Sequence, residues 1–151
     1  MNEMMEWVRY SNSIGFSFEG RARRREYWWN TLYWQLIICA ISFAVQALFL
    51  ALRLVGAEDS SVYAILYSVL SCVASIAGFV ISIWKLLPIT VRRFHDRGLS
   101  GWIYLACVVG SCCCGIGSIV GLVLCCLDSQ PGTNQYGPNP KEAVINFFKL
   151  A

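Results

Sequence analysis

Three long stretches of the chain contain no charged residue: 27–52, 60–84 and 98–127. They are 26, 25 and 30 residues long. A helix that crosses the hydrocarbon core of a bilayer, about 30 Å thick, needs roughly 20 apolar residues at about 1.5 Å each. Each stretch is long enough to cross. The pattern predicts an all-α membrane protein, a compact bundle of three transmembrane helices with short loops, in a single integral membrane domain over residues 1–151.

The third stretch, residues 98–127, could also follow a backbone path other than a single straight helix. A helix of 30 residues would be about 45 Å long, and the centre of this stretch, residues 110–121, is rich in Gly and Cys. The segment could therefore be kinked, or could re-enter as a hairpin. Because broken backbone exposed to lipid is costly, we favour a single tilted or kinked crossing.

Turn-forming residues follow the third stretch. The tail, residues 128–151, contains the run Pro-Gly-Thr-Asn-Gln-Tyr-Gly-Pro-Asn-Pro at 131–140, which cannot continue a helix. We expect a turn-rich surface loop there. Residues 143–150 lean apolar and could rest on the membrane or dock on the bundle.

Composition agrees with a membrane protein. The chain is 57% hydrophobic and 14% charged, against about 45–50% and 25% in soluble domains. Residues 1–26 carry many charges and do not resemble a cleavable signal peptide. The first stretch is therefore expected to serve as its own insertion signal.

The distribution of Lys and Arg predicts the orientation. Five lie in residues 1–26, one lies in the first loop (Arg53), and four lie between residues 85 and 97. The N-terminus and the second loop are therefore expected in the cytoplasm. The tail contains two basic residues, Lys141 and Lys149. Three crossings would place it outside, whereas a hairpin would return it to the cytoplasm.

Two arginine-rich blocks border the apolar stretches, and Trp and Tyr residues adjoin them at the expected membrane interface. Anionic lipids attract basic side chains near the surface by about 1 kcal/mol each. One interpretation is that this border sets the topology and anchors the helices in the membrane. The sharper hypothesis is that these arginines bind anionic phospholipid headgroups or other anions: Arg21, Arg23, Arg24, Arg25, Arg92, Arg93 and Arg97.

His95 and Asp96 are the other polar residues of interest in the second block. Adjacent residues on a helix do not face each other, so a catalytic pair would need an irregular backbone. We expect interhelix polar contacts instead, with Asp96 paired to an arginine of the N-terminal block. No catalytic residues are assigned.

Eight cysteines all lie within the apolar stretches. Buried cysteine packs as a small hydrophobe, and no His or carboxylate is near them in sequence to complete a zinc site. We therefore expect inert packing, no metal and no cofactor. A redox or metal cluster involving 112–114 with Cys125 and Cys126 is the minor alternative.

Three sequence blocks together resemble the domain of unknown function 805 family, small bacterial inner-membrane proteins of the YhaH type. The blocks are Phe-Glu-Gly-Arg-Ala-Arg-Arg-Arg-Glu-Tyr-Trp at 18–28, Arg-Arg-Phe-His-Asp-Arg-Gly-Leu-Ser-Gly-Trp at 92–102 and Asn-Gln-Tyr-Gly-Pro-Asn-Pro at 134–140. The chain departs from the family pattern at Phe94, at Gln135 and in its cysteine run. The resemblance implies a location in the bacterial inner membrane and no established activity; the three uncharged stretches predict that the protein is multi-pass.

The sequence therefore predicts a non-enzymatic membrane protein whose arginine-rich cytoplasmic face binds anionic lipid or a partner protein. The alternative is an oligomeric transporter or channel subunit, because Gln35, Ser42 and Gln46 recur on one face of the first stretch. A weaker third hypothesis is an enzyme acting on headgroups through His95 and Asp96. The lipid bilayer is the expected partner, with a homo-oligomer or another membrane protein as further candidates. Nucleic acid is not expected to bind.

Overall fold

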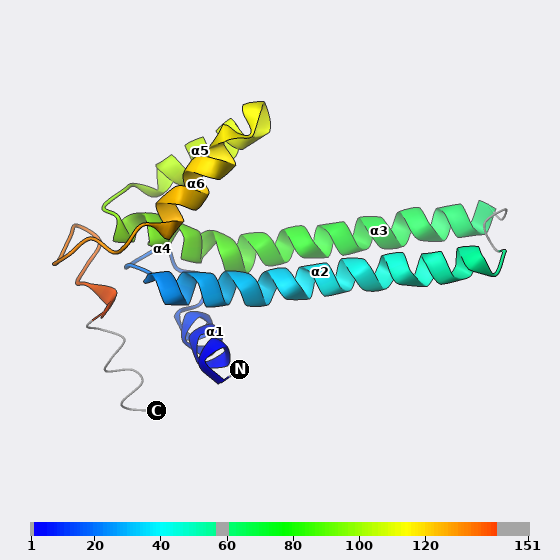
Figure 1. Cartoon of the computed structure of the whole chain (residues 1–151), viewed down its shortest axis with the longest axis horizontal. Helices are drawn as coiled ribbons and strands as arrows, with labels where there is room; N and C mark the ends of the chain where they lie inside the picture. Colours follow the sequence, from blue (N-terminus) through cyan, green and yellow to red (C-terminus); the bar gives the residue numbers. More distant parts are fainter. Residues whose placement is uncertain (1, 57–60, 142–151) are drawn as a thin grey trace.

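The computed structural model describes residues 2–56 and 61–141. Two helices form a long antiparallel rod (Figure 1): α2 (Arg24–Leu54) and α3 (Ser61–Ile81). The 31 residues of α2 extend about 46 Å. The described part of the chain contains no β-strand, and an isolated bridge joins Asn134 to Gly137.

The helix that begins with α3 continues to the polar end of the rod. A π-helical segment, η2 (Ser82–Leu86), leads into α4 (Leu87–Asp96), so helix runs from Ser61 to Asp96. The amide of Leu87 donates to the carbonyl of Ser82, five residues earlier. Proline lacks an N–H and its ring clashes with the carbonyl four residues back. The wider π turn just before Pro88 accommodates the proline ring.

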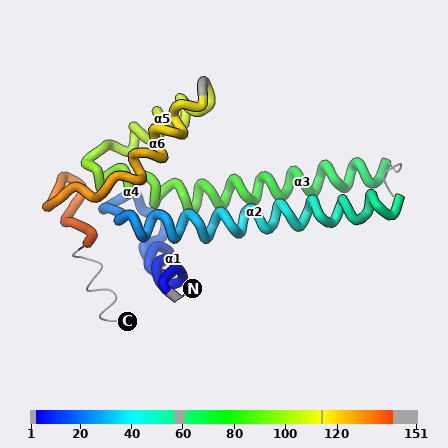
Figure 2. Tube along the Cα trace, viewed as in Figure 1, coloured from blue at the N-terminus to red at the C-terminus, as the bar shows by residue number. Residues whose placement is uncertain are grey.

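The third uncharged stretch does not form one helix. It forms α5 (Gly101–Cys114) and α6 (Ile116–Cys126), which pack antiparallel as a short hairpin (Figures 1 and 2). Gly115 makes the turn at φ +73°, a conformation that glycine adopts readily and other residues rarely do. The favoured prediction of a single tilted or kinked crossing is therefore wrong for this segment. The all-α class is confirmed for the described residues, and the compact bundle of three transmembrane helices is not confirmed.

Close backbone packing holds the hairpin together. A Cβ atom built on Gly117 would lie 2.0 Å from the carbonyl oxygen of Cys107, and one on Gly110 would lie 3.5 Å from the Cα of Gly117. Small residues let two helices approach this closely without a hydrophobic driving force in lipid. At about 21 Å and 17 Å, neither arm is long enough to cross a bilayer.

A short amphipathic helix, α1 (Asn2–Ile14), packs against the start of α2. It lies across the rod in Figure 1. Trp7, Val8 and Ser11 are buried on its inner face, and Ser11 accepts a hydrogen bond of 2.7 Å from Asn30 of α2. The sequence reading had treated this segment only as part of the arginine-rich N-terminus.

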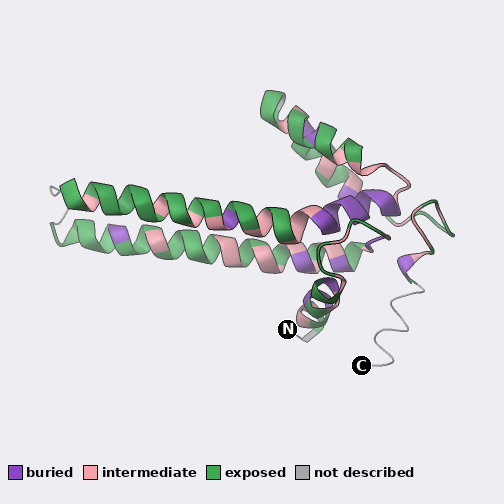
Figure 3. Ribbon diagram, turned by 180° about the vertical axis from the view of Figure 1, so that it is seen from behind, coloured by how far each residue is buried: buried purple, intermediate pink, exposed green. Residues whose placement is uncertain are grey.

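Burial is concentrated at one end of the molecule. Every residue of α4 from Pro88 to Asp96 is buried, whereas most of α2 and α3 is exposed, as Figure 3 shows. The exposed residues of the rod are largely Leu, Ile, Val and Phe. A surface this apolar is expected to meet lipid or another protein and not water. We call the end where α2 begins and α4 ends the base of the rod.

Candidate functional site

Five charged residues form a buried ion-pair cluster at the base: Arg21, Glu26, Arg92, Arg93 and Asp96. They come from the loop before α2, the first turn of α2 and the last turns of α4. Their formal charges sum to +1, from three arginines and two carboxylates. Charges removed from water must be paired, and the contacts below give each of the five an oppositely charged partner. Both carboxylate oxygens of Glu26 and the Nε of Arg92 are buried without a hydrogen-bond partner among the described residues.

Arg93 occupies the centre of the cluster and is fully buried. Its guanidinium pairs with Asp96 on the same helix, and it donates to the carbonyls of Ala22, Cys125 and Leu127. The last carbonyls of α6 have no partner within their own helix, and the helix dipole makes that end electronegative. Arg93 therefore caps α6 and joins it to α4 and to the N-terminal segment.

Arg21 reaches the same carboxylate from the N-terminal segment. Its Nε donates to Asp96 Oδ1 at 3.0 Å, and its terminal nitrogens donate to the carbonyls of Gln130, Gly132 and Gly137 in the tail. The sequence reading had paired Asp96 with an arginine of this block. In the structure, Asp96 forms ion pairs with both Arg21 and Arg93.

A second ion pair joins α2 to α4. Arg92 Nη1 lies 3.3 Å from Glu26 Oε1, with both side chains almost completely buried. Arg92 also donates to the hydroxyl of Ser11, at 3.4 Å. Burial, and after it the Glu26 carboxylate, raises the pKa of the nearby Tyr10 hydroxyl. Because Arg92 of α4 contacts both Glu26 of α2 and Ser11 of α1, the Glu26–Arg92 ion pair connects these three helices.

The tail packs over the end of α4 through His95. The rings of His95 and Tyr136 stack with centroids 3.8 Å apart and an interplanar angle of 3°. Asn134 donates to the backbone carbonyl of His95 at 2.9 Å. The backbone amide of Gln130 donates to the backbone carbonyl of Asp96 at 3.1 Å. His95 and Asp96 thus contact different groups and do not form an acid–base pair with each other.

The seven arginines proposed from sequence fall into two groups. Arg21, Arg92 and Arg93 are buried in the ion-pair cluster. The other four lie nearer the surface: Arg24 and Arg25 are exposed, and Arg23 and Arg97 are half-buried.

The four arginines outside the cluster contact neighbouring elements at the base. Arg24 and Arg97 donate to the carbonyls of Cys126 and Asp128 at the end of α6. Arg25 forms a solvent-exposed ion pair of 3.3 Å with Glu3, and Arg23 lies over the ring of Trp7. An exposed ion pair such as Arg25–Glu3 contributes little to stability, so Arg25 can exchange partners at small cost.

The family is shown by comparison with known sequences. The sequence profile described as "Protein of unknown function (DUF805)" matches residues 15–138. The chain belongs to this family. The predicted resemblance is thereby confirmed. No solved structure matches the chain.

Two relatives in Escherichia coli K12 are named as inner membrane proteins. Inner membrane protein YhaI is 36% identical over 140 residues, which cover 91% of this chain and 97% of YhaI. Inner membrane protein YhaH is 28% identical over 139 residues, covering 91% of this chain and 98% of YhaH. The DUF805 match begins just after α1 and includes all five residues of the ion-pair cluster.

Sequence reasoning missed several residues of this DUF805 site. Glu26 and Asn30 are four residues apart on α2 and both are buried, a spacing that places them on one face of a helix. That spacing was a usable signal, because both stand where the apolar stretch begins. Asn134 and Tyr136 stand in the third block that carries the family resemblance, but nothing in the sequence paired them with His95, which lies 39 and 41 residues away in the chain.

The described cysteines are free thiols, and Cys107 and Cys125 are buried. Within residues 2–56 and 61–141, no group of three His, Cys, Asp or Glu residues could hold a metal ion.

Gln46 is one of the residues that suggested a transporter or channel subunit. It accepts a hydrogen bond of 3.2 Å from Tyr67 and so helps to pair α2 with α3.

Proposed function

We propose that this DUF805 protein is a multi-pass inner-membrane protein without enzymatic activity, whose arginine-rich base binds the headgroups of anionic phospholipids. One observation carries the proposal. The buried ion-pair cluster uses three arginines, and Arg23, Arg24, Arg25 and Arg97 remain outside it at the same end of the rod. Trp28, 40% exposed, follows Arg24 and Arg25 on α2, as expected at a membrane interface.

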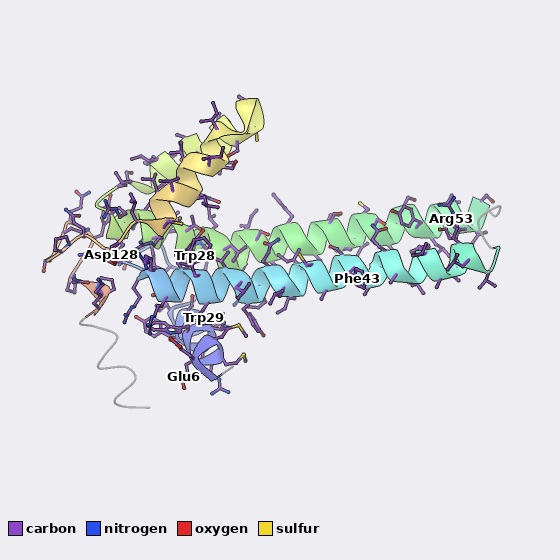
Figure 4. All side chains as sticks on the ribbon, in the orientation of Figure 1. Glu6, Trp28, Trp29, Phe43, Arg53 and Asp128 are labelled. Atoms are coloured by element: carbon purple, nitrogen blue, oxygen red, sulfur yellow. The ribbon has the colours of Figure 1, made fainter. Side chains whose placement is uncertain are left out.

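The proposed topology has two crossings. α2 and the helix from Ser61 to Asp96 are long and apolar enough to span a bilayer, and the α5–α6 hairpin would enter from the base and return to it. Figure 4 supports this arrangement, with Arg53 near the far tip of the rod and Asp128 at the base. Eleven of the twelve Lys and Arg residues would then lie on the cytoplasmic side, the exception being Arg53.

Reporter fusions test the topology. We expect a reporter that is active only in the cytoplasm to be active when fused after Ala151, because α6 ends at the base beside Arg24 and Arg93. A reporter active only in the periplasm should be active when inserted after Gly56, at the far end of α2. Periplasmic activity at the C-terminus would contradict the hairpin topology.

Lipid selectivity tests the function. The protein is placed in nanodiscs with equal amounts of phosphatidylglycerol and phosphatidylethanolamine, and the retained lipids are counted by native mass spectrometry. We expect each replacement of Arg23, Arg24, Arg25 or Arg97 by glutamine to lower the preference for phosphatidylglycerol by up to about fivefold, equivalent to about 1 kcal/mol per basic residue.

The matched control is Arg53→Gln, because Arg53 is the basic residue assigned to the opposite leaflet. It should leave the preference measured at the base unchanged. If the fourfold variant of Arg23, Arg24, Arg25 and Arg97 retains the wild-type preference for phosphatidylglycerol, anionic lipid binding by this surface is refuted.

A further inference from the structure

A groove of about 820 Å³ runs between the helix formed by α3, η2 and α4 and the first arm of the hairpin, α5. Its body is lined by apolar side chains of both helices, among them Phe79, Ile83, Leu87, Leu105 and Val108. Pockets of this size with a largely apolar lining and a few placed polar groups are typical of small-molecule and lipid sites.

The course of α5 opens the groove. At the start of α5, a Cβ atom on Gly101 would lie 2.9 Å from Cγ1 of Val91, so α5 touches α4 closely there. Farther along, the hairpin diverges from α3, as Figure 1 shows. The groove is therefore narrow at the base and open toward the side of the rod that we assign to lipid.

Most polar groups of the lining lie toward the base end of the groove, where His95, Ser100, Tyr104 and Tyr136 line it. Ser82 lies farther along, and its hydroxyl donates to the carbonyl of Gly78 on the same helix. His95 is 9% exposed, and its Nδ1 is buried without a well-formed hydrogen bond in the described residues, although the backbone of Phe18 and Gly20 interacts with its ring. Its Nε2 faces the start of α5, where a Cβ on Gly101 would lie 3.6 Å away. A buried polar atom without a well-formed hydrogen bond in a native structure calls for an explanation, and a bound ligand is one.

We infer that this groove binds one acyl chain of a glycerophospholipid from the cytoplasmic leaflet, with the polar ester and headgroup region hydrogen-bonded to His95. The inference uses the topology proposed above but not the exposed arginines. Along α3 and η2, the apolar body from Phe79 to Leu87 extends about 12 Å, close to the half-thickness of a hydrocarbon core of about 30 Å.

An amphiphile fits better than a second protein helix. The polar lining is concentrated at headgroup level, and the body at chain level is apolar apart from the Ser82 hydroxyl, which is bonded to its own helix. This asymmetry matches that of a lipid. A protein helix has a diameter of about 10–12 Å with its side chains and would not need a polar group at one end only. A neutral imidazole carries one donor and one acceptor, so it can bind an ester carbonyl or a phosphate oxygen.

The test uses full-length protein in phosphatidylethanolamine nanodiscs, with retained lipid counted by native mass spectrometry. Leu105→Trp fills the groove, and His95→Phe keeps a ring to stack on Tyr136 but removes both nitrogens. We expect at least about a tenfold lower retention in each variant. Val73→Trp is the matched control, since Val73 is exposed on α3 and does not line the groove; it should retain lipid as the wild type does.

A second measurement keeps the inference testable where a variant folds poorly. Wild-type protein is irradiated in phosphatidylethanolamine carrying a photoreactive group on one acyl chain, and crosslinked peptides are mapped. Crosslinks concentrated in 79–91 and 100–108 are expected, and an even distribution over the rod would overturn the inference. Unchanged retention in both variants, or a dimer that Leu105→Trp dissociates, would overturn it as well.

The two proposals fail separately. Replacing Arg23, Arg24, Arg25 and Arg97 by glutamine should leave retention of the zwitterionic lipid in the groove unchanged. The groove variants should in turn leave the preference for phosphatidylglycerol over phosphatidylethanolamine at the base unchanged.

Discussion

Replacing Asp96 by asparagine should destabilise the protein more than any other single polar substitution at the base, by about 3–5 kcal/mol. The side chain of Asp96 is fully buried and its carboxylate holds two arginines at once. Asparagine keeps the shape but removes the negative charge, and its amide offers one acceptor oxygen in place of two. Arg21 and Arg93 would then be buried with a single remaining carboxylate in the cluster, that of Glu26.

The reason for the large effect is the cost of an unpaired buried charge. Forming a buried ion pair gains little over apolar residues of the same volume, because desolvation offsets the attraction. Removing one partner is different, since the other stays desolvated without compensation. Asp96 also lies where α4, the N-terminal segment and the tail meet through Arg21 and Arg93, so its loss loosens all three.

Thermal unfolding in a mild detergent, followed by intrinsic fluorescence, measures the change. Asp128→Asn is the control, because Asp128 pairs with Lys141 at the surface, where both side chains are well exposed. The control should unfold with the wild type. An Asp96→Asn variant that also unfolded with the wild type would show that the buried pairs do not hold the base together.

The second large effect is expected at Gly117, where alanine should force the α5–α6 hairpin apart. Its Cβ would lie 2.0 Å from the carbonyl oxygen of Cys107, 2.6 Å from the amide nitrogen of Ser111 and 2.8 Å from the carbonyl carbon of Gly110. All three are backbone atoms, so no side chain can rotate away. Overpacking typically costs about 1–3 kcal/mol, and the absence of a flexible neighbour favours the upper end of that range.

Gly121→Ala is the matched control on the same helix. Its Cβ would lie 3.8 Å from the Cβ of Cys107, an ordinary van der Waals contact, and alanine is the better helix former by up to about 1 kcal/mol. It should be neutral or slightly stabilising. We would measure both variants by thermal unfolding, together with the accessibility of Cys107 and Cys125 to a thiol reagent.

Exposure of these buried cysteines in Gly117→Ala but not in Gly121→Ala is the expected outcome. Equal behaviour of the two variants would mean that α5 and α6 do not pack through Gly117. Since both cysteines are buried in the wild type, their reactivity reports on the hairpin more directly than the unfolding temperature alone.

The uncharged stretches predicted the two long helices well, and their failure at the third stretch has a physical cause. Hydrophobicity reports that a segment avoids water, but it does not report the path of the backbone within lipid. A single residue, Gly115 at φ +73°, reverses the chain, and the close approach at Gly117 makes the reversal stable. The Gly- and Cys-rich centre signalled this alternative without deciding for it.

The candidate site was only partly predictable for a related reason. The two arginine blocks, with His95 and Asp96, indicated the correct end of the molecule, because charges next to apolar stretches must lie at a membrane border. Arg23 and Arg21 look alike in sequence. Only one of them is buried, because Asp96, 75 residues away, reaches Arg21 at 3.0 Å.

The sequence by itself determined the helical class, the DUF805 family, the two long apolar helices and the end at which the charges collect. These follow from composition, local periodicity and short motifs, which the chain carries regardless of its path. The tertiary structure alone decided that the third stretch turns back, that the tail covers α4, and which arginines pair internally. Each of these depends on contacts between residues distant in the chain, where the burial of a charge or the close approach of two backbones selects one arrangement.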